Sequence, residues 1–85
     1  MSRSVFSEPH QELRAALKAA RLEAGLGQAE LATRLQKPQS FLSKIERGER
    51  TLDVIEFLIV ARAIGVDGTE IIRKVATRLP SDARL

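Results

Sequence analysis

The polar side chains best placed for chemistry lie in the nine residues between Pro38 and Gly48. Wound at the roughly 100° per residue of an α-helix, this stretch is polar along one arc. The polar arc consists of Gln39, Ser40, Ser43, Lys44 and Arg47. The opposite arc is apolar and contains Phe41, Leu42 and Ile45. Amides, hydroxyls and cations gathered on one face suit recognition by hydrogen bonding and charge.

Catalysis finds little support in the rest of the chain. The sequence has no Cys, Tyr or Trp, and its single histidine, His10, falls near the start of an expected helix. Nucleophilic catalysis needs a nucleophile, a base and an orienting group, and a metal site needs ligands at a regular spacing. The sequence therefore predicts a protein that is not an enzyme and that uses no metal or cofactor.

Length and composition indicate one small domain. The chain has 85 residues, of which 44% are hydrophobic, and we expect a core of about residues 8–79 with flexible ends at 1–6 and 81–85. Lysine and arginine outnumber acidic residues by 14 to 11, and this net charge of +3 favours a polyanionic partner. Because no apolar run is long enough for a signal peptide or a membrane span, the expected location is the cytoplasm.

Apolar spacing, with Gly and Pro between the apolar segments, predicts five helices. The expected ranges are 8–24, 28–35, 38–47, 52–64 and 67–79, with Pro38 in the first turn of the third helix and Gly48 at its C-cap. Ser7 and Thr51 are the expected N-caps of the first and fourth helices. The spacing of Asp67 and Glu70 predicts a capping box on the fifth. The fourth helix is apolar on almost every side, so we expect it at the centre of the core.

The segment QAELATRLQKPQSFLSKIERGER, with ARLEAGLGQAEL before it and LDVIEFLIVARAIGVD after it, resembles the Xre family over about residues 11–75. The resemblance implies an all-α, compact five-helix lambda-repressor-like fold, with a helix-turn-helix at the second and third helices. Apolar residues must pin these two short helices onto the core, and they are Leu31, Leu35, Leu42 and Ile45. Ala32 is small where the short helices cross most closely.

Two details of the resemblance concern single positions. The family often has Gly at the turn between the two short helices, where positive φ is suited to glycine, but this chain has Gln36. The resemblance also implies a partly buried ion pair between Arg21 and Glu46.

The same resemblance places the third helix in the major groove of double-stranded DNA. The implied base-reading residues are Pro38, Gln39, Ser40 and Lys44. Gln39 suits adenine, because its amide can donate to N7 and accept from N6. The implied phosphate contacts are Gln28, Lys37, Ser43, Arg47 and Arg50. Lys44 could contact guanine or a phosphate, and Phe41 could belong to the core edge, the DNA backbone or a thymine methyl.

The fifth helix has an apolar stripe formed by Ile72, Val75 and Leu79. In proteins that look like this one, the last helix often meets its two-fold mate, so the stripe is the expected dimer interface. The alternative is that the stripe packs inward on the first and fourth helices. A dimer would place two recognition helices about 34 Å apart and would predict an inverted-repeat operator.

The resemblance therefore implies a sequence-specific DNA-binding transcriptional regulator of bacterial or phage type, nucleoid-associated when bound. We expect a homodimeric repressor or autoregulator. The alternative is an antitoxin or a protein-interaction module that uses the same fold with a protein partner. Retention of DNA binding after changes at Gln39 and Lys44 would favour the interaction module.

Overall fold

The computed structural model describes residues 8–85, and this part of the chain contains five helices. They are α1 (Glu8–Glu23), α2 (Gln28–Leu35), α3 (Gln39–Glu46), α4 (Val54–Ile64) and α5 (Gly68–Arg78). The predicted all-α, five-helix fold is confirmed. None of these helices is long and apolar enough to cross a bilayer. The predicted N-cap Ser7 and the expected flexible end at 1–6 lie outside the described residues, while residues 81–85 form no helix or strand.

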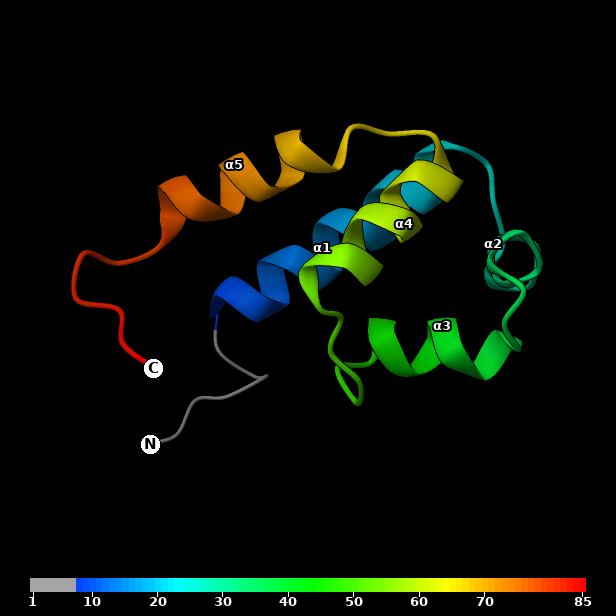
Figure 1. Cartoon of the computed structure of the whole chain (residues 1–85), viewed down its shortest axis with the longest axis horizontal. Coiled ribbons are helices and arrows are strands. Elements are labelled where there is room, and N and C mark those ends of the chain that lie inside the picture. Colours follow the sequence, from blue (N-terminus) through cyan, green and yellow to red (C-terminus); the bar gives the residue numbers. More distant parts are fainter. Residues whose placement is uncertain (1–7) are drawn as a thin grey trace.

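Helices α1 and α4 form the middle of the molecule (Figure 1). Helix α5 packs against both of them on one side, and the pair α2 and α3 packs on the other. Apolar side chains fill the space between, and the buried cluster includes Leu17, Leu26, Leu31, Leu42, Phe57 and Val60. Because α3 lies at the edge of this arrangement, one of its faces packs inward and the other is open to solvent.

Four helices end next to a residue in the left-handed backbone region. Three of these residues are glycines, with φ between 75° and 101°, and they are Gly25, Gly48 and Gly65. The fourth is Gln36 after α2, at φ 58° and ψ 42°. The N–H groups of Gln36 and Lys37 donate to the carbonyls of Thr33 at 3.0 Å and Ala32 at 2.9 Å, which closes the helix. The turn thus has positive φ at the residue where the family often has glycine.

The start of α4 differs from the prediction. Its N-cap is Asp53, so the N-cap predicted at Thr51 is wrong. The Asp53 carboxylate accepts from the Glu56 N–H at 2.7 Å, and the Glu56 carboxylate accepts from the Asp53 N–H at 3.0 Å. This reciprocal box requires a glutamate three residues after the cap, and the residue three after Thr51 is Val54.

The capping box predicted on α5 is present only in part. Asp67 is the N-cap, and its carboxylate accepts from the N–H of Thr69 at 3.0 Å and from the Thr69 hydroxyl at 2.6 Å. The reciprocal role predicted for Glu70 is wrong, because its carboxylate accepts from Nη1 of Arg73 at 2.7 Å instead. These bonds lower the pKa of Asp67, since the donors from Thr69 favour its charged form.

Helix α4 is buried on one face only, contrary to the expectation from its composition. The buried face consists of Phe57, Val60, Ala61 and Ile64. Ile55 and Ile59 lie on the opposite side and are 64% and 51% exposed, and Val54 in the first turn of α4 is 64% exposed. We call these three residues the α4 edge. Exposed side chains of this size are not explained by the core, so the apolar content of α4 exceeds what the core requires.

The left-handed residue Gln36 leads to a prediction about stability. Replacing Gln36 with Gly should raise the free energy of unfolding by about 0.5 to 1 kcal/mol, because glycine adopts positive φ without the Cβ penalty. Chemical denaturation would measure the change. The reciprocal control is Gly25→Gln, at φ 75° with open space around the missing Cβ, which should lower stability by about 1 kcal/mol. A less stable Gln36→Gly protein would mean that the Gln36 side chain contributes more than its backbone strain costs.

Candidate nucleic-acid interface

Helices α2 and α3 are joined by the short turn at residues 36–38 and pack against each other. Helix α2 buries Leu31 and Ala32, and α3 buries Leu42 and Ile45. Burial of Leu42 and Ile45 against the core stabilises α3, which at eight residues is too short to be a stable helix alone. The polar arc of α3 therefore faces solvent: Gln39, Ser40, Lys44 and Arg47 are exposed, and Ser43 is half-buried.

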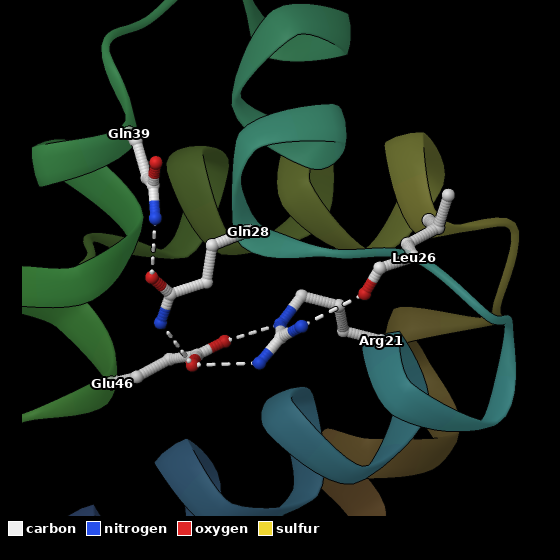
Figure 2. Close-up of polar contacts among 5 residues, drawn as sticks. All are labelled: Arg21, Leu26, Gln28, Gln39 and Glu46. Atoms are coloured by element: carbon white, nitrogen blue, oxygen red, sulfur yellow. Dashed lines mark hydrogen bonds and ion pairs between the residues drawn. The ribbon is translucent and has the colours of Figure 1, made fainter.

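A chain of polar contacts connects the interior to this exposed face (Figure 2). Arg21 donates from Nε to Oε2 of Glu46 at 2.7 Å, and from Nη2 to Oε1 of Glu46 at 3.0 Å. Its Nη1 donates to the Leu26 carbonyl at 2.8 Å. Nε2 of Gln28 donates to Oε1 of Glu46 at 2.8 Å, and Nε2 of Gln39 donates to Oε1 of Gln28 at 3.2 Å. The side chains of Arg21 and Glu46 are each only 7% exposed, so this ion pair is buried.

This series of polar contacts fixes the orientation of the Gln28 and Gln39 side-chain amides. An ionised carboxylate only accepts hydrogen bonds, so Glu46 selects the orientation in which Gln28 presents its NH₂ group to it. The Gln28 oxygen then faces Gln39 and draws the NH₂ group of Gln39 toward itself. Figure 2 shows Oε1 of Gln39 pointing away from Gln28. Gln39 therefore offers solvent an acceptor and a second N–H donor, which is the pair that the N6 and N7 edge of adenine requires.

The charge state of Glu46 follows from the same contacts. Burial opposes its ionisation and would raise its pKa. Hydrogen bonds from Arg21 and Gln28, with the positive charges of Arg21 and Lys18, outweigh burial and hold the pKa of Glu46 below its ordinary value of 4.5. Glu46 is therefore ionised at neutral pH, and the acceptor-only argument holds.

Two of the predicted phosphate contacts have acidic neighbours. Arg47 donates from Nε to Glu49 at 2.9 Å, and Arg50 donates from Nη2 to Glu56 at 3.0 Å. The hydrogen bond and charge of Arg47 lower the pKa of Glu49, and the hydrogen bond from Arg50 lowers the pKa of Glu56. The side chains of Arg47 and Glu49 are both more than half exposed, so their pair is weak and can exchange for a phosphate at little cost.

The remaining predicted residues occupy the turn and the outer face of α3. Pro38 is the N-cap of α3 and has no capping side chain. The Ser43 hydroxyl donates to the Ser40 carbonyl at 3.3 Å. The ammonium group of Lys37 lies 5.4 Å from the centroid of the Phe41 ring. Lys44 forms no ion pair within residues 8–85, so its charge is available to a ligand.

Sequence reasoning missed several participants. Lys18 contributes positive charge near Glu46, and its position one helical turn before Arg21 could have indicated this. The acidic partners Glu49 and Glu56 follow Arg47 and Arg50 closely in sequence, but a charge pattern alone does not distinguish a pair from two solvated groups. Within the described residues, no group of three or more His, Cys, Asp or Glu side chains could hold a metal ion.

The apolar stripe predicted as the dimer interface consists of Ile72, Val75 and Leu79, and we call it the α5 stripe. It lines an apolar groove of about 270 Å³ between α5 and the start of α4. Its lining includes Leu13, Leu52, Val54, Phe57, Ile72, Val75, Ala76 and Leu79. Ile72 is 38% exposed and Leu79 is 47% exposed, whereas Val75 is half-buried. Val54 lines the groove too, so the α4 edge adjoins the groove at this one residue.

The buried ion pair predicts a pH-dependent loss of stability. Replacing Glu46 with Gln should cost about 3 kcal/mol at pH 7, because Arg21 would remain buried without its counter-charge. A carboxylate whose pKa is lowered by folding stabilises the protein above its unfolded pKa and loses this effect as pH falls through its folded pKa. The gap between the two proteins should therefore be full above about pH 5 and shrink below 4.5, the ordinary value for Glu46.

Urea denaturation of both proteins between pH 3 and pH 7 would measure that gap. Glu49→Gln is the control, because Glu49 is exposed and its loss should change stability little at any pH. A gap that stays constant over this range would exclude Glu46 as the source of the pH dependence.

Comparison with known proteins places this geometry in a family. The HTH_3 family model, described as Helix-turn-helix, matches residues 17–71. An XRE-family like protein from Pseudomonas syringae pv. tomato is 47% identical with a TM-score of 0.80, over 85% of this chain and 88% of that chain. The clp gene regulator ClgR from Corynebacterium glutamicum is 27% identical with a TM-score of 0.69, over 79% of this chain and 71% of that chain.

A second ClgR structure is 23% identical, with a TM-score of 0.74 over 92% of this chain and 100% of that chain, and supports the fold alone. None of the curated proteins matches the chain. The family match covers more than half of the residues, and the Pseudomonas protein agrees in both sequence and fold. The chain therefore belongs to the Xre family of helix-turn-helix proteins.

Proposed function

We propose that this helix-turn-helix protein is a transcriptional regulator that binds double-stranded DNA of specific sequence. It works as a homodimeric repressor or autoregulator on an inverted-repeat operator. The observation that carries the proposal is the chain of contacts from Glu46 through Gln28 to Gln39, which orients a base-reading amide on an exposed helix face. The likeness to ClgR, a clp gene regulator, supports a regulatory role.

In this proposal α3 enters the major groove and reads base edges from its first two turns. Gln39 accepts from N6 and donates to N7 of one adenine, with the atoms that its bond to Gln28 leaves available. Ser40 and Pro38 lie beside it at the start of the helix and contact the neighbouring base pair. Lys44 follows one turn later, where it donates to guanine or to a phosphate.

Phosphate binding begins at the N-terminus of α2. Its N-cap is Gly27, which has no side chain to accept from the first N–H groups of the helix. These donors and the positive end of the helix favour an anion beside Gln28. On the face of α3, Ser43 and Arg47 contact phosphates of the DNA backbone. Arg47 exchanges its weak bond to Glu49 for such a phosphate. Such contacts position the protein without selecting a sequence.

The groove between α4 and α5 supports a homodimer through the α5 stripe. An apolar groove with Ile72 and Leu79 on its wall can receive the matching side chains of a second copy, as a two-fold interface requires. The adjoining α4 edge enlarges the surface that such a contact would cover. Two copies joined here would present two α3 helices to successive major-groove faces of an inverted repeat.

One observation favours a second function, that of an antitoxin or another protein-binding module. Ile55 and Ile59 of the α4 edge lie opposite the buried face of α4, and an apolar protein partner could cover them. This function does not require the oriented amides of α3. It would be favoured if changes at Gln39 and Lys44 left the biological activity unaffected.

Selection of randomised duplexes by the purified protein at two salt concentrations tests the proposed function directly. Enrichment of an inverted repeat with half-sites about one helical turn apart is expected. Binding that selects no sequence and disappears at moderate salt would show that the protein binds DNA only through non-specific electrostatic attraction. This result would contradict the proposal.

Base reading by Gln39 predicts a specific loss of affinity. Gln39→Ala should weaken binding to the selected operator by about 1 to 3 kcal/mol and change binding to random duplex little. Fluorescence anisotropy titrations on both duplexes would measure this difference. Thr77→Ala on α5, far from α3, is the matched control and should alter neither affinity. Equal losses of affinity on both duplexes would mean that Gln39 does not recognise a base.

The proposed interface predicts a change of mass. Leu79→Asp should convert the dimer to monomers in sedimentation experiments, because a charge would have to be buried in the apolar groove. Leu79 suits this test better than Val75, which is half-buried and whose replacement could disturb α5 itself. The control is Leu22→Asp, since Leu22 on α1 is 57% exposed, against 47% for Leu79, but does not line the groove. If the dimer persists in the Leu79→Asp variant but dissociates in the Ile55→Asp variant, the dimer interface lies at the α4 edge.

A further inference from the structure

Phe41 occupies an unusual position on α3. It is half-buried and packs against the edge of the core cluster. Two cations also approach its ring: the Lys37 ammonium lies 5.4 Å from the centroid and the Arg50 guanidinium lies 4.7 Å from it. Both distances are in the range of cation–π attraction. Packing against the core would require only an apolar side chain, so the core does not explain the two cations.

The Phe41 ring lies on the flank of α3 opposite the bonded glutamines. From Gln39 to Phe41 the helix turns by roughly 200°, and the contact with Gln28 is on the Gln39 side. An α-helix in the major groove has one DNA backbone on each side. The N-terminus of α2 serves one flank in the proposed function, and the cations around Phe41 are on the other.

Arg50 is held in place on this flank. Its Nη2 donates to Oε2 of Glu56 at 3.0 Å, and its Nη1 donates to Oε1 of Glu56 at 3.4 Å and to the Thr51 carbonyl at 3.0 Å. Glu56 is itself fixed, because it accepts from the N–H of Asp53 in the capping box of α4. The guanidinium plane is therefore set by the start of α4 and by the ring of Phe41.

Part of the guanidinium remains available. A guanidinium has five N–H donors, and Glu56 and Thr51 take those of its Nη1 and one of its Nη2. Within the described residues, the Nε–H and the other Nη2 N–H make no hydrogen bond. These two donors form one edge of the fork, which matches two oxygens of a phosphate. Within the described residues Lys37 forms no ion pair, so its ammonium and the unused edge of Arg50 can both bind an anion.

We infer that Phe41 is a positioning residue for DNA phosphate: its ring holds Lys37 and Arg50 so that both bind one backbone on this flank of α3. The inference rests on the proposed function, since it names the second backbone contact of the same interface. Phe41 itself touches neither base nor phosphate in this arrangement and acts through the two cations.

The test uses the full chain with Phe41→Leu, which keeps an apolar side chain against the core and removes the aromatic face. Affinity for the selected operator and for random duplex is measured at several salt concentrations, with melting temperatures to verify the fold. We expect Phe41→Leu to weaken binding to both duplexes by the same factor, roughly threefold to tenfold. Phe41→Tyr retains the ring face and should bind within about twofold of the original chain.

A double-mutant cycle separates positioning from a general loss of structure. In a chain that already has Lys37→Gln and Arg50→Gln, Phe41→Leu should change affinity by less than about twofold. In a Lys44→Gln chain, which loses a cation that does not contact the ring, the full effect of Phe41→Leu should remain. Arg50→Lys keeps the charge but loses the fork, so it should weaken binding while the salt dependence stays nearly unchanged.

Three results would overturn the inference. Unchanged affinity after Phe41→Leu would remove any role of the ring in binding. An equal loss in the Lys37→Gln, Arg50→Gln chain and in the Lys44→Gln chain would mean that Phe41 acts through the fold of α3. Failure of the original chain to bind any duplex at low salt would contradict the proposed function, and this inference with it.

Discussion

The buried ion pair between Arg21 and Glu46 is the interaction on which the rest of the interface depends. Removing two charges from water costs several kcal/mol for each ion, and only close pairing with satisfied donors and acceptors offsets this cost. Here Arg21 donates to both oxygens of Glu46 and to the Leu26 carbonyl, so its charge is matched and its fork is used. The pair joins the end of α1 to the end of α3, and the bond to Leu26 fixes the connection that leads into α2. A hydrophobic contact at this place could hold the helices together, but it could not orient an amide.

The surface charges have a different energetic role. The bond between Arg47 and Glu49 is exposed to water, so it contributes little to stability and opposes an approaching phosphate only weakly. The bond between Arg50 and Glu56 is less exposed and is tied to the capping box of α4. It can persist while the other edge of the Arg50 guanidinium binds. An arginine suits this position because its planar fork has two separate edges, whereas a lysine ammonium is a compact charge without a fork.

Much of the fold could be predicted from local patterns. Glycines after α1, α3 and α4, and apolar residues at helical spacing, were enough to predict the helices, because backbone geometry at helix ends depends on a few neighbouring residues. The N-cap of α4 was missed although Asp53 and Glu56 have the spacing of a capping box, so this error lay in the interpretation of the pattern. The exposure of the α4 edge could not be predicted, because an apolar residue has the same letter whether it meets the core or another molecule.

The candidate site depended more on tertiary structure. The polar arc of α3 follows from helical periodicity, and the pairing of Arg21 with Glu46 was implied by resemblance. The bond between Gln28 and Gln39 joins two helices across a turn, and no short-range pattern indicates which atom of each amide faces the other. The place of Phe41 between two cations likewise requires the chain to return after α3, which brings Arg50 back to the ring.

In the proposed function, these contacts let a helix of only eight residues read bases precisely. Alone, α3 would not be helical, and its glutamine would sample several rotamers in water. Folding fixes its backbone through Leu42 and Ile45, and it fixes the Gln39 amide through Gln28 and Glu46 before any ligand arrives. The entropy of ordering that side chain is thus lost during folding and does not reduce the binding affinity. The proposed specificity would therefore depend on residues that never touch the DNA, above all on the buried carboxylate of Glu46.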